Sequence, residues 1–243
     1  MIKGLYTSAS GMIPHIKRQE ASANNIANAG TPGFKKDIVF TRELSRAEAR
    51  MQPKKSDWVQ PMINDVFTDY APGIFERTGN PLDLAIEGDG FFTLESEDGA
   101  TLLTRAGSFT VDADGFLAFP GGLLAIGEGG PIEVGNGKVS VSVTGEVEVD
   151  GMAVARVVPR TVADLDQLEK VGSSMFAVPD GVELIDVEKT YIRQGFLEAS
   201  NVDIVREMID MIASYRAYEA NARGVQAQDQ SLNHLFGRVA GKS

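Results

Sequence analysis

Two pairs of carboxylates stand at spacings that could serve acid–base hydrolysis: Asp83 with Glu87, and Glu95 with Glu97. Glycosidases use one carboxylic acid and one carboxylate on either side of the bond they cleave, so such pairs could act on a glycan. The single tryptophan, Trp58, could stack on a sugar ring. These carboxylates lie in a strongly acidic stretch, however, so a solvated charged surface is the preferred interpretation, and Trp58 is better interpreted as a hydrophobic anchor.

The sequence has few residues that could bind a metal, act as a nucleophile or hold a cofactor. There is no cysteine, and the two histidines, His15 and His234, are too far apart in sequence for a ligand motif. Residues 112–115 (DADG) start like a calcium loop, but the third ligand and the distal glutamate are missing, so a β-turn is predicted. No phosphate loop or nucleophile elbow occurs. We therefore expect no catalytic residue, no metal and no cofactor.

Composition describes an ordinary globular chain with an uneven charge. Its 243 residues are 43% hydrophobic and 23% charged, with no apolar run near eighteen residues, so no membrane insertion is expected. The first twenty residues have no continuous apolar region, which predicts no cleaved signal peptide. The net charge of −11 argues against a nucleic-acid partner. Residues 71–195 carry −13, whereas residues 1–70 carry +3 and residues 196–243 carry −1.

Apolar or small residues near the N-terminus recur at alternating spacings of 4 and 3, which is a heptad seam. The seam consists of Leu5, Ala9, Met12, Ile16, Gln19, Ala23 and Ile26. Residues 28–33 (NAGTPG) predict its end, because glycine and proline terminate helices. Pro14 interrupts the seam, and a proline costs about 3 kcal/mol in a helix interior. We therefore expect a helix that starts near Pro14 or is kinked there, rather than an unbroken one.

A longer seam of the same kind fills the C-terminus. It consists of Ile204, Met208, Met211, Tyr215, Tyr218, Ala222, Val225, Asp229, Leu232, Phe236 and Val239. Ser200 and Asp203 predict a capping box that opens the helix. Such a helix would hold roughly 35 residues and measure about 50 Å, which suits a coiled coil. Ile209 and Ile212 add a second apolar row, so we expect this helix to meet more than one neighbour.

The middle of the chain changes to a period of two. Val139, Val141 and Val143 alternate with serines, and Val147 and Val149 alternate with glutamates beyond a turn at residue 145, which predicts a half-buried hairpin. Repeated Asp-Gly and Gly-Gly pairs predict many short antiparallel strands. The predicted fold class is α+β, with N- and C-terminal helices forming a coiled-coil-like assembly domain around a central antiparallel β-rich domain. The expected segments are 1–34 (helical), 35–74 (extended connector), 75–195 (β-rich outer domain) and 196–243 (long helix pairing with the first segment).

If the helices that carry the two seams paired only with each other, the free energy gained by burial would roughly equal the backbone entropy lost on ordering. Burial of a Leu, Ile or Val contributes about 1.5–3 kcal/mol, whereas ordering each residue costs roughly 1–2 kcal/mol of backbone entropy. Only about two positions in seven are apolar, and several N-terminal ones are alanine. This balance favours termini that order on assembly with further subunits.

Seven motifs follow one another over nearly the whole chain. They are residues 5–12 (LYTSASGM), 24–35 (NNIANAGTPGFK), 78–92 (TGNPLDLAIEGDGFF), 103–109 (LTRAGSF), 115–117 (GFL), 194–202 (QGFLEASNV) and 216–221 (RAYEAN). In this order they resemble the N-terminal signature, the β-domain motifs and the C-terminal signature of flagellar rod and hook axial proteins. Length and the stretch 125–132 (AIGEGGPI) are more similar to the proximal-rod members than to the distal-rod members, which are usually longer.

The resemblance implies a non-enzymatic, torque-transmitting subunit of the bacterial flagellar basal body. It would be exported unfolded by the flagellar type III apparatus, then polymerise across the periplasm with helices inside and β domains outside. Its partners would be copies of itself, other rod and hook axial proteins, and the export apparatus. The expected subunit-interface residues are Leu5, Met12, Ile16, Ile26, Phe34, Ile204, Met208, Met211, Tyr215, Tyr218, Val225 and Leu232. A distal-rod or hook paralogue is one alternative, and a secreted glycan-binding β protein is another.

Overall fold

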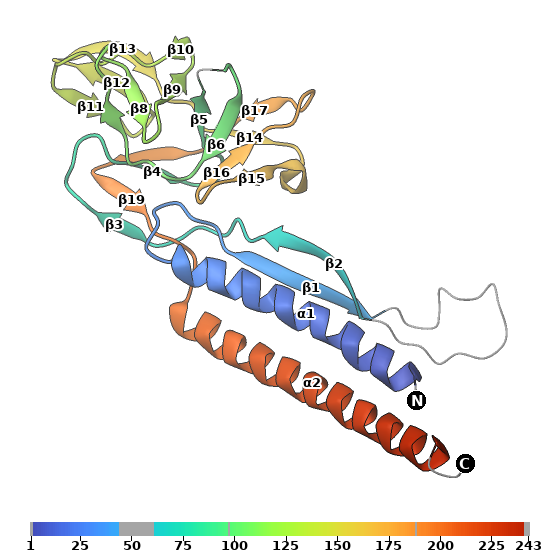
Figure 1. Ribbon diagram of the computed structural model, residues 1–243. Coiled ribbons are helices and arrows are strands. Elements are labelled where there is room, and N and C mark those ends of the chain that lie inside the picture. Colours follow the sequence, from blue (N-terminus) through green and yellow to red (C-terminus); the bar gives the residue numbers. More distant parts are fainter. Residues whose placement is uncertain (1, 44–60, 97, 188, 241–243) are drawn as a thin grey trace. The chain divides into compact units, whose positions relative to one another are not determined.

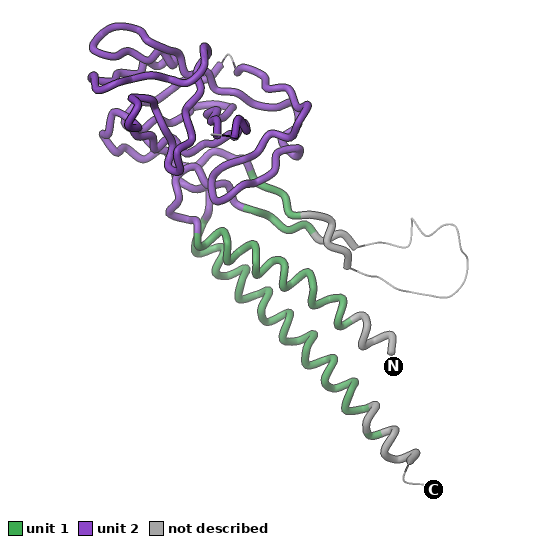
Figure 2. Tube along the Cα trace, turned by 45° about the horizontal axis from the view of Figure 1, so that its top comes forward, with its two compact units in different colours: residues 1–27, 37–69, 203–243 green, residues 28–36, 70–202 purple. Residues whose placement is uncertain are grey.

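The structure is a computed structural model that describes residues 2–43, 61–96, 98–187 and 189–240 (Figure 1). Side chains are described for residues 8–40, 66–96, 98–187, 189–231 and for His234. The chain forms two compact units (Figure 2). The helical unit contains residues 1–27, 37–69 and 203–243, and the β unit contains residues 28–36 and 70–202.

The helical unit consists of two long helices and a β-hairpin. Helix α1 spans Ile2–Ala27 and helix α2 spans Ile204–Ala240. They run antiparallel and lie side by side in both views (Figures 1 and 2). Strands β1 (Asp37–Glu43) and β2 (Pro61–Thr68) pair antiparallel, with a register shift between Phe40 and Thr41. Both strands also contact α1, so the first helix has a neighbour on more than one side.

The expectation of a purely helical, coiled-coil-like assembly domain is wrong. The unit that holds both helices also contains the β1–β2 hairpin, formed within the stretch expected to be an extended connector. The sequence of this hairpin does not show the apolar–polar alternation of a half-buried strand. Phe40 is 56% exposed and Val66 is 51% exposed, so its apolar residues do not mark one buried face. The architecture is α+β, with one helix at each end of the chain and β structure between them.

Small and polar residues lie at positions where α1 and α2 approach each other closely. A Cβ atom built on Gly11 would lie 3.3 Å from Nδ2 of Asn221, and one built on Gly224 would lie 3.5 Å from Oγ of Ser8. These positions precede seam residues by one: Gly11 precedes Met12, and Asn221 precedes Ala222. The helices are therefore rotated relative to the predicted seam, which turns part of the apolar surface away from the pair.

Helix α1 begins at Ile2 and continues through Pro14, so a start of the helix near Pro14 is not what the structure shows. Pro14 is buried, and the packing of this part of the helix offsets the lost backbone hydrogen bond. The predicted capping box at the start of α2 is also corrected. Asp203 is the capping residue, because its Oδ1 accepts a hydrogen bond from the backbone N–H of Arg206 at 3.1 Å. Ser200 instead accepts a bond from the Val202 N–H.

The β unit is built of short strands, and all their pairings are antiparallel. The largest sheet has the order β15-β16-β6-β5-β9-β8-β7, with β10 beside β9, and smaller sheets are β11-β12-β13, β14-β17, β18-β4 and β19-β3. One 3₁₀ turn spans Leu165–Gln167. The strands are β3 (Phe75–Arg77), β4 (Leu84–Glu87), β5 (Phe92–Glu95), β6 (Thr101–Thr104), β7 (Thr110–Val111), β8 (Leu117–Phe119), β9 (Leu123–Gly127), β10 (Gly130–Pro131), β11 (Val139–Val141), β12 (Glu146–Val149), β13 (Met152–Arg156), β14 (Arg160–Val162), β15 (Glu169–Val171), β16 (Met175–Ala177), β17 (Leu184–Asp186), β18 (Tyr191–Gln194) and β19 (Phe196–Glu198).

The valine hairpin is confirmed. Strand β11 pairs antiparallel with β12, and Val139, Val141 and Val147 are buried in the larger of two hydrophobic clusters. Asp150 and Gly151, both at positive φ, turn the chain into β13 as the Asp-Gly pair predicts. The β-turn at residues 112–115 is also confirmed, because Oδ1 of Asp112 accepts hydrogen bonds from two backbone N–H groups of its own loop.

Candidate assembly interface

The first three turns of α2 carry a row of exposed apolar side chains. At 3.6 residues per turn these positions cover one broad side of the helix. Their exposed fractions are 44% for Ile204, 67% for Val205, 49% for Met208, 61% for Ile209, 56% for Ile212 and 57% for Tyr215. We call these six residues the α2 apolar face.

Helix α1 adds two exposed apolar side chains to the same unit. Ile13 is 54% exposed and Ile16 is 38% exposed. Large apolar residues scattered singly over a surface are ordinary, whereas a contiguous row marks an interaction surface. Burial of one such side chain is worth about 1.5–3 kcal/mol. The α2 apolar face therefore offers a substantial driving force to any partner that covers it.

The expected interface residues divide into four groups. Ile16, Ile204, Met208 and Tyr215 are exposed, whereas Met12, Ile26, Met211, Tyr218 and Val225 are half-buried. Phe34 is not on the helical surface at all, since it is 1% exposed within the β unit. The side chains of Leu5 and Leu232 lie outside those that the structure describes. Within one chain, four of the described members are thus left exposed and five are partly covered.

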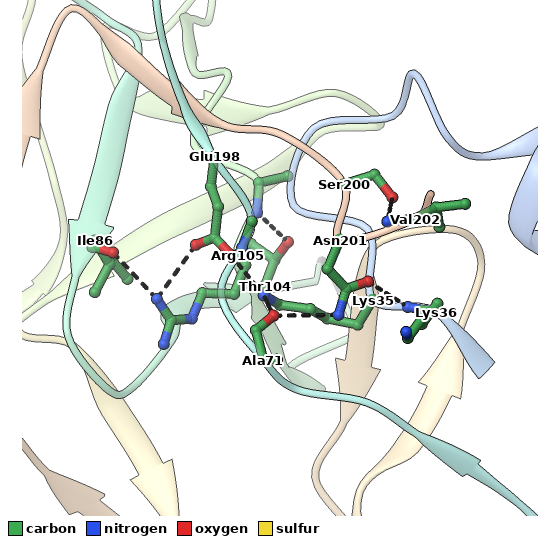
Figure 3. A network of polar contacts seen from close by, with 12 residues as sticks. Lys35, Lys36, Ala71, Ile86, Thr104, Arg105, Glu198, Ser200, Asn201 and Val202 are labelled. Atoms are coloured by element: carbon green, nitrogen blue, oxygen red, sulfur yellow. Dashed lines mark hydrogen bonds and ion pairs between the residues drawn. The ribbon is translucent and has the colours of Figure 1, made fainter. Parts of the chain in front are cut away.

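A buried charge cluster lies inside the β unit, at the residues where the chain enters and leaves it (Figure 3). Nζ of Lys35 donates to Oε1 of Glu198 at 2.5 Å, and Nη1 of Arg105 donates to Oε2 of the same carboxylate at 3.3 Å. The side chains of Lys35 and Glu198 are fully buried, and that of Arg105 is 6% exposed. Two buried cations therefore pair with the same buried carboxylate.

The charge cluster also fixes the backbone of three chain segments. Lys35 donates to the carbonyl of Ala71 at 2.8 Å, and Oε1 of Glu198 accepts the N–H of Gly73 at 3.0 Å. Asn201 bonds the same two segments, with Oδ1 accepting from Lys36 N–H and Nδ2 donating to the Ala71 carbonyl (Figure 3). Residues 35, 71 and 201 each lie within two residues of a boundary between the two units. The segments at these boundaries are thus bound to one another within the β unit.

The electrostatics of the cluster make Glu198 its critical member. Burial lowers the pKa of Arg105, while the Glu198 charge and hydrogen bond act to raise it. Arginine nevertheless remains charged in a folded protein, so the Arg105 cation persists at neutral pH. Arg105 also donates to the carbonyls of Ile86 and Gly88, which compensates part of its desolvation. Breaking a buried ion pair on one side strands the other charges, which is far more costly than the pair is stabilising.

The sequence reasoning missed this cluster. A signal was present, because Lys35, Arg105 and Glu198 each lie inside one of the motifs that carry the family resemblance. Charged residues inside such motifs, flanked by glycine, alanine and aromatic residues, were candidates for buried partners. Their pairing across 163 residues of sequence could not be inferred from spacing.

The carboxylate pairs considered for glycan hydrolysis do not assemble a site. Asp83 is buried and accepts a hydrogen bond from Asn80. Glu87 bonds Arg193 at 2.6 Å, and this hydrogen bond lowers the pKa of Glu87, the opposite of what a general acid requires. Glu95 is exposed, and both Glu97 and Trp58 lie outside the described residues. Among the described residues, no three His, Asp or Glu side chains are grouped to hold a metal ion.

No helix in the described part of the chain is long and apolar enough to cross a membrane.

Comparison with known proteins gives matches along most of the chain. The families described as "Flagella basal body rod protein", "Flagellar hook protein FlgE/F/G D1 domain" and "Flagellar basal body rod FlgEFG protein C-terminal" match residues 5–35, 85–149 and 193–235. The flagellar basal-body rod protein FlgF of Caulobacter vibrioides is 32% identical, over 92% of this chain and 92% of its own. The flagellar basal-body rod protein FlgG of Bacillus subtilis is 30% identical, over 97% of this chain and 98% of its own.

Proposed function

Because the chain belongs to the flagellar basal-body rod protein family and is a structural subunit of that rod, we propose that it polymerises through the exposed apolar surface of its helical unit. The observation that carries this proposal is the α2 apolar face, whose six side chains are 44–67% exposed. Such a face is costly in a protein that acts alone. It is useful in a subunit that neighbouring subunits cover.

The contact surface differs from a paired heptad seam. The close α1–α2 contact uses Gly11 and Gly224, which allow the two helices to approach within one subunit. The larger apolar residues of α2, together with Ile13 and Ile16, then remain free for contacts between subunits. We propose that Met12, Ile26, Met211, Tyr218 and Val225, which are half-buried, complete their burial at the same contacts.

The charge cluster supports a mechanical role for the connections between the units. A rod that transmits torque needs its outer domains to follow its axial helices. Lys35, Glu198 and Asn201 bind the boundary segments firmly within the β unit, so load entering these segments is passed to its core. We propose that the helical unit forms the axial part of the rod and that the β unit lies outside it.

Membership of the family gives the location of the protein and the general class of its partners. The protein acts in the flagellar basal body together with other rod and hook components. We further propose that it binds copies of itself, is delivered by the flagellar type III apparatus without a cleaved signal peptide, and has no enzymatic activity. We also propose a place in the proximal rod, because residues 125–132 (AIGEGGPI) are more similar to the proximal-rod members.

The polymerisation proposal is tested with Met208→Asp in the full chain. Met208 is 49% exposed, so the charge is tolerated in the monomer but has to be desolvated in a covered interface. We expect loss of swimming motility, and loss of rods in isolated basal bodies, when this variant is the cell's sole copy. The β unit should keep its native near-ultraviolet circular dichroism.

Ala213→Asp is the matched control. It adds the same charge to the same helix at another exposed position, about 140° around the axis from Met208 at 3.6 residues per turn. We expect this variant to support motility. Normal motility of the Met208 variant would refute the proposed interface. Equal loss in both variants would mean that the face is not the determinant.

A further inference from the structure

One asparagine of the β unit stands in a chemically labile setting. Asn136 is followed by Gly137, and this is the single Asn-Gly pair in the sequence. The pair lies in the exposed turn that precedes β11, after Gly135 at a φ of 54°. Within the described residues, neither the Asn136 amide nor the Gly137 N–H has a hydrogen-bond partner. Both groups are therefore free to react with each other.

The structure requires glycine at residue 137. A Cβ atom built there would lie 2.3 Å from Cγ1 of Val149 and 2.7 Å from Oδ2 of Asp150. Contacts this short essentially do not occur in real proteins, so any other residue would force the side chains of Val149 and Asp150 to shift. The absence of a side chain at residue 137 is also what leaves the carbonyl carbon of the Asn136 amide open to attack from the backbone.

We propose that Asn136 is a site of spontaneous deamidation in the folded protein. The backbone nitrogen of Gly137 attacks Cγ of Asn136, loses its proton to solvent base, and forms a new C–N bond that closes a five-membered succinimide. The Cγ–Nδ2 bond breaks, and the amide nitrogen leaves as ammonia. Water then opens the ring at either carbonyl, which yields aspartate or isoaspartate at residue 136.

Three other asparagines of the chain are protected from this reaction. Asn25 uses both amide atoms, with Nδ2 donating to the Asp37 carbonyl and Oδ1 accepting from the Asp37 N–H, each at 2.9 Å. Asn201 is engaged in the same way by Lys36 and Ala71. Asn80 precedes Pro81, which has no N–H to deprotonate. Of these four asparagines, Asn136 is therefore the one open to the reaction.

The modification would act on a part of the β unit that is anchored on both sides. Before the turn, the N–H groups of Val134 and Gly135 both donate to the Gly115 carbonyl at 2.8 Å. After it, Lys138 N–H donates to Oδ1 of Asp150 at 3.0 Å. Isoaspartate inserts one extra carbon into the main chain between these anchors, and either product places a new carboxylate near Asp150. We expect the β11–β12–β13 sheet to be destabilised.

The test is incubation of the purified full chain in mildly alkaline buffer, followed by trypsin digestion and mass spectrometry. Residues 106–138 form one tryptic peptide whose single asparagine is Asn136. We expect that peptide to gain the mass of an NH-to-O replacement, with isoaspartate identified by electron-transfer fragmentation. Peptides containing Asn25, Asn80 and Asn201 should stay unchanged over the same period.

Two controls separate the effect of the folded structure from the intrinsic reactivity of an Asn-Gly pair. Asn136→Gln should abolish the mass gain, because glutamine would have to close a less favourable six-membered ring. Incubation in urea should expose Asn25 and Asn201 to slow conversion, while Asn136 still reacts first. An unmodified Asn136 in the folded chain, or conversion of Asn201 at the same rate, would overturn the proposal. The result bears on the turn alone, so it is independent of the test of polymerisation.

Discussion

The two units of this protein differ in how completely they bury their side chains. The β unit buries its apolar residues in two clusters and encloses even charged groups, with Lys35 and Glu198 at 0% exposure. The helical unit leaves the six residues of the α2 apolar face at least 44% exposed, and glycine, serine and asparagine lie where its helices approach each other closely. The first unit has satisfied its interactions within one chain, whereas the second has not.

This contrast teaches where the free energy of each unit comes from. A domain with a closed core is stable as a monomer, because burial of its apolar surface offsets the conformational entropy of ordering. Two helices joined by small residues recover little of that entropy by themselves. The helical unit is therefore expected to gain its stability from neighbouring subunits, so that folding and assembly of this part of the chain are one process.

The largest expected effect is on the free energy of unfolding of the β unit, when the buried carboxylate of Glu198 is removed. Glu198→Gln removes the carboxylate charge that both Lys35 and Arg105 contact inside the β unit, and removal of one partner from a buried pair costs about 3–5 kcal/mol. We expect urea unfolding of the β unit, followed by near-ultraviolet circular dichroism, to shift by this amount. Glu133→Gln, at an exposed position, should change the stability by less than about 0.5 kcal/mol. Similar effects of the two variants would contradict the role given to Glu198.

A smaller effect is expected at the glycines between the helices. Gly11→Leu would place a side chain against Asn221, where even a Cβ atom lies 3.3 Å from Nδ2, and overpacking of this kind costs about 1–3 kcal/mol. Assembled rods carrying this variant should dissociate at a lower urea concentration. Gly224→Ala is the contrasting change, because its Cβ meets Oγ of Ser8 at an ordinary 3.5 Å. It should raise helix stability by up to about 1 kcal/mol. Identical behaviour of the two variants would show that the helices do not approach at these glycines.

The smallest effect is a pH dependence confined to the helical unit. Burial, followed by the charge of Arg18, lowers the pKa of His15 below its ordinary value of 6.5. A base with a lower pKa in the folded state binds fewer protons when folded, so stability falls as the pH drops through 6.5. We expect helix content, followed by far-ultraviolet circular dichroism of assembled rods, to decline over that range. His15→Gln should remove this part of the decline, and an unchanged profile would rule His15 out as its cause.

The sequence predicted the local elements whose pattern is strong and self-contained. The valine hairpin at β11–β12, the Asp-Gly turn after it and the long helix starting near residue 204 all follow from period and turn chemistry. The family resemblance rested on long motifs, and the comparisons bear it out. The β1–β2 hairpin was missed, because its apolar residues do not alternate with burial.

The rotation of the two helices and the charge cluster could not be predicted from the sequence. Seam positions such as Met208 and Tyr215 have the right spacing for a coiled coil, and spacing alone does not reveal whether apolar residues meet their own helix partner or another subunit. Small residues at Gly11 and Gly224 set the close contact instead. Likewise, the Lys35–Glu198 pair depends on long-range chain topology, which no local pattern encodes.

The central claim is that the helical unit becomes stable only when neighbouring subunits cover it. Hydrogen exchange of the purified monomer, followed peptide by peptide and repeated on assembled rods, tests it most directly. We predict rapid exchange of residues 8–27 and 204–231 in the monomer beside a protected β unit, and protection of these helices in the rod. Slow exchange throughout the monomer would mean a helical unit that is stable by itself, and would contradict the account.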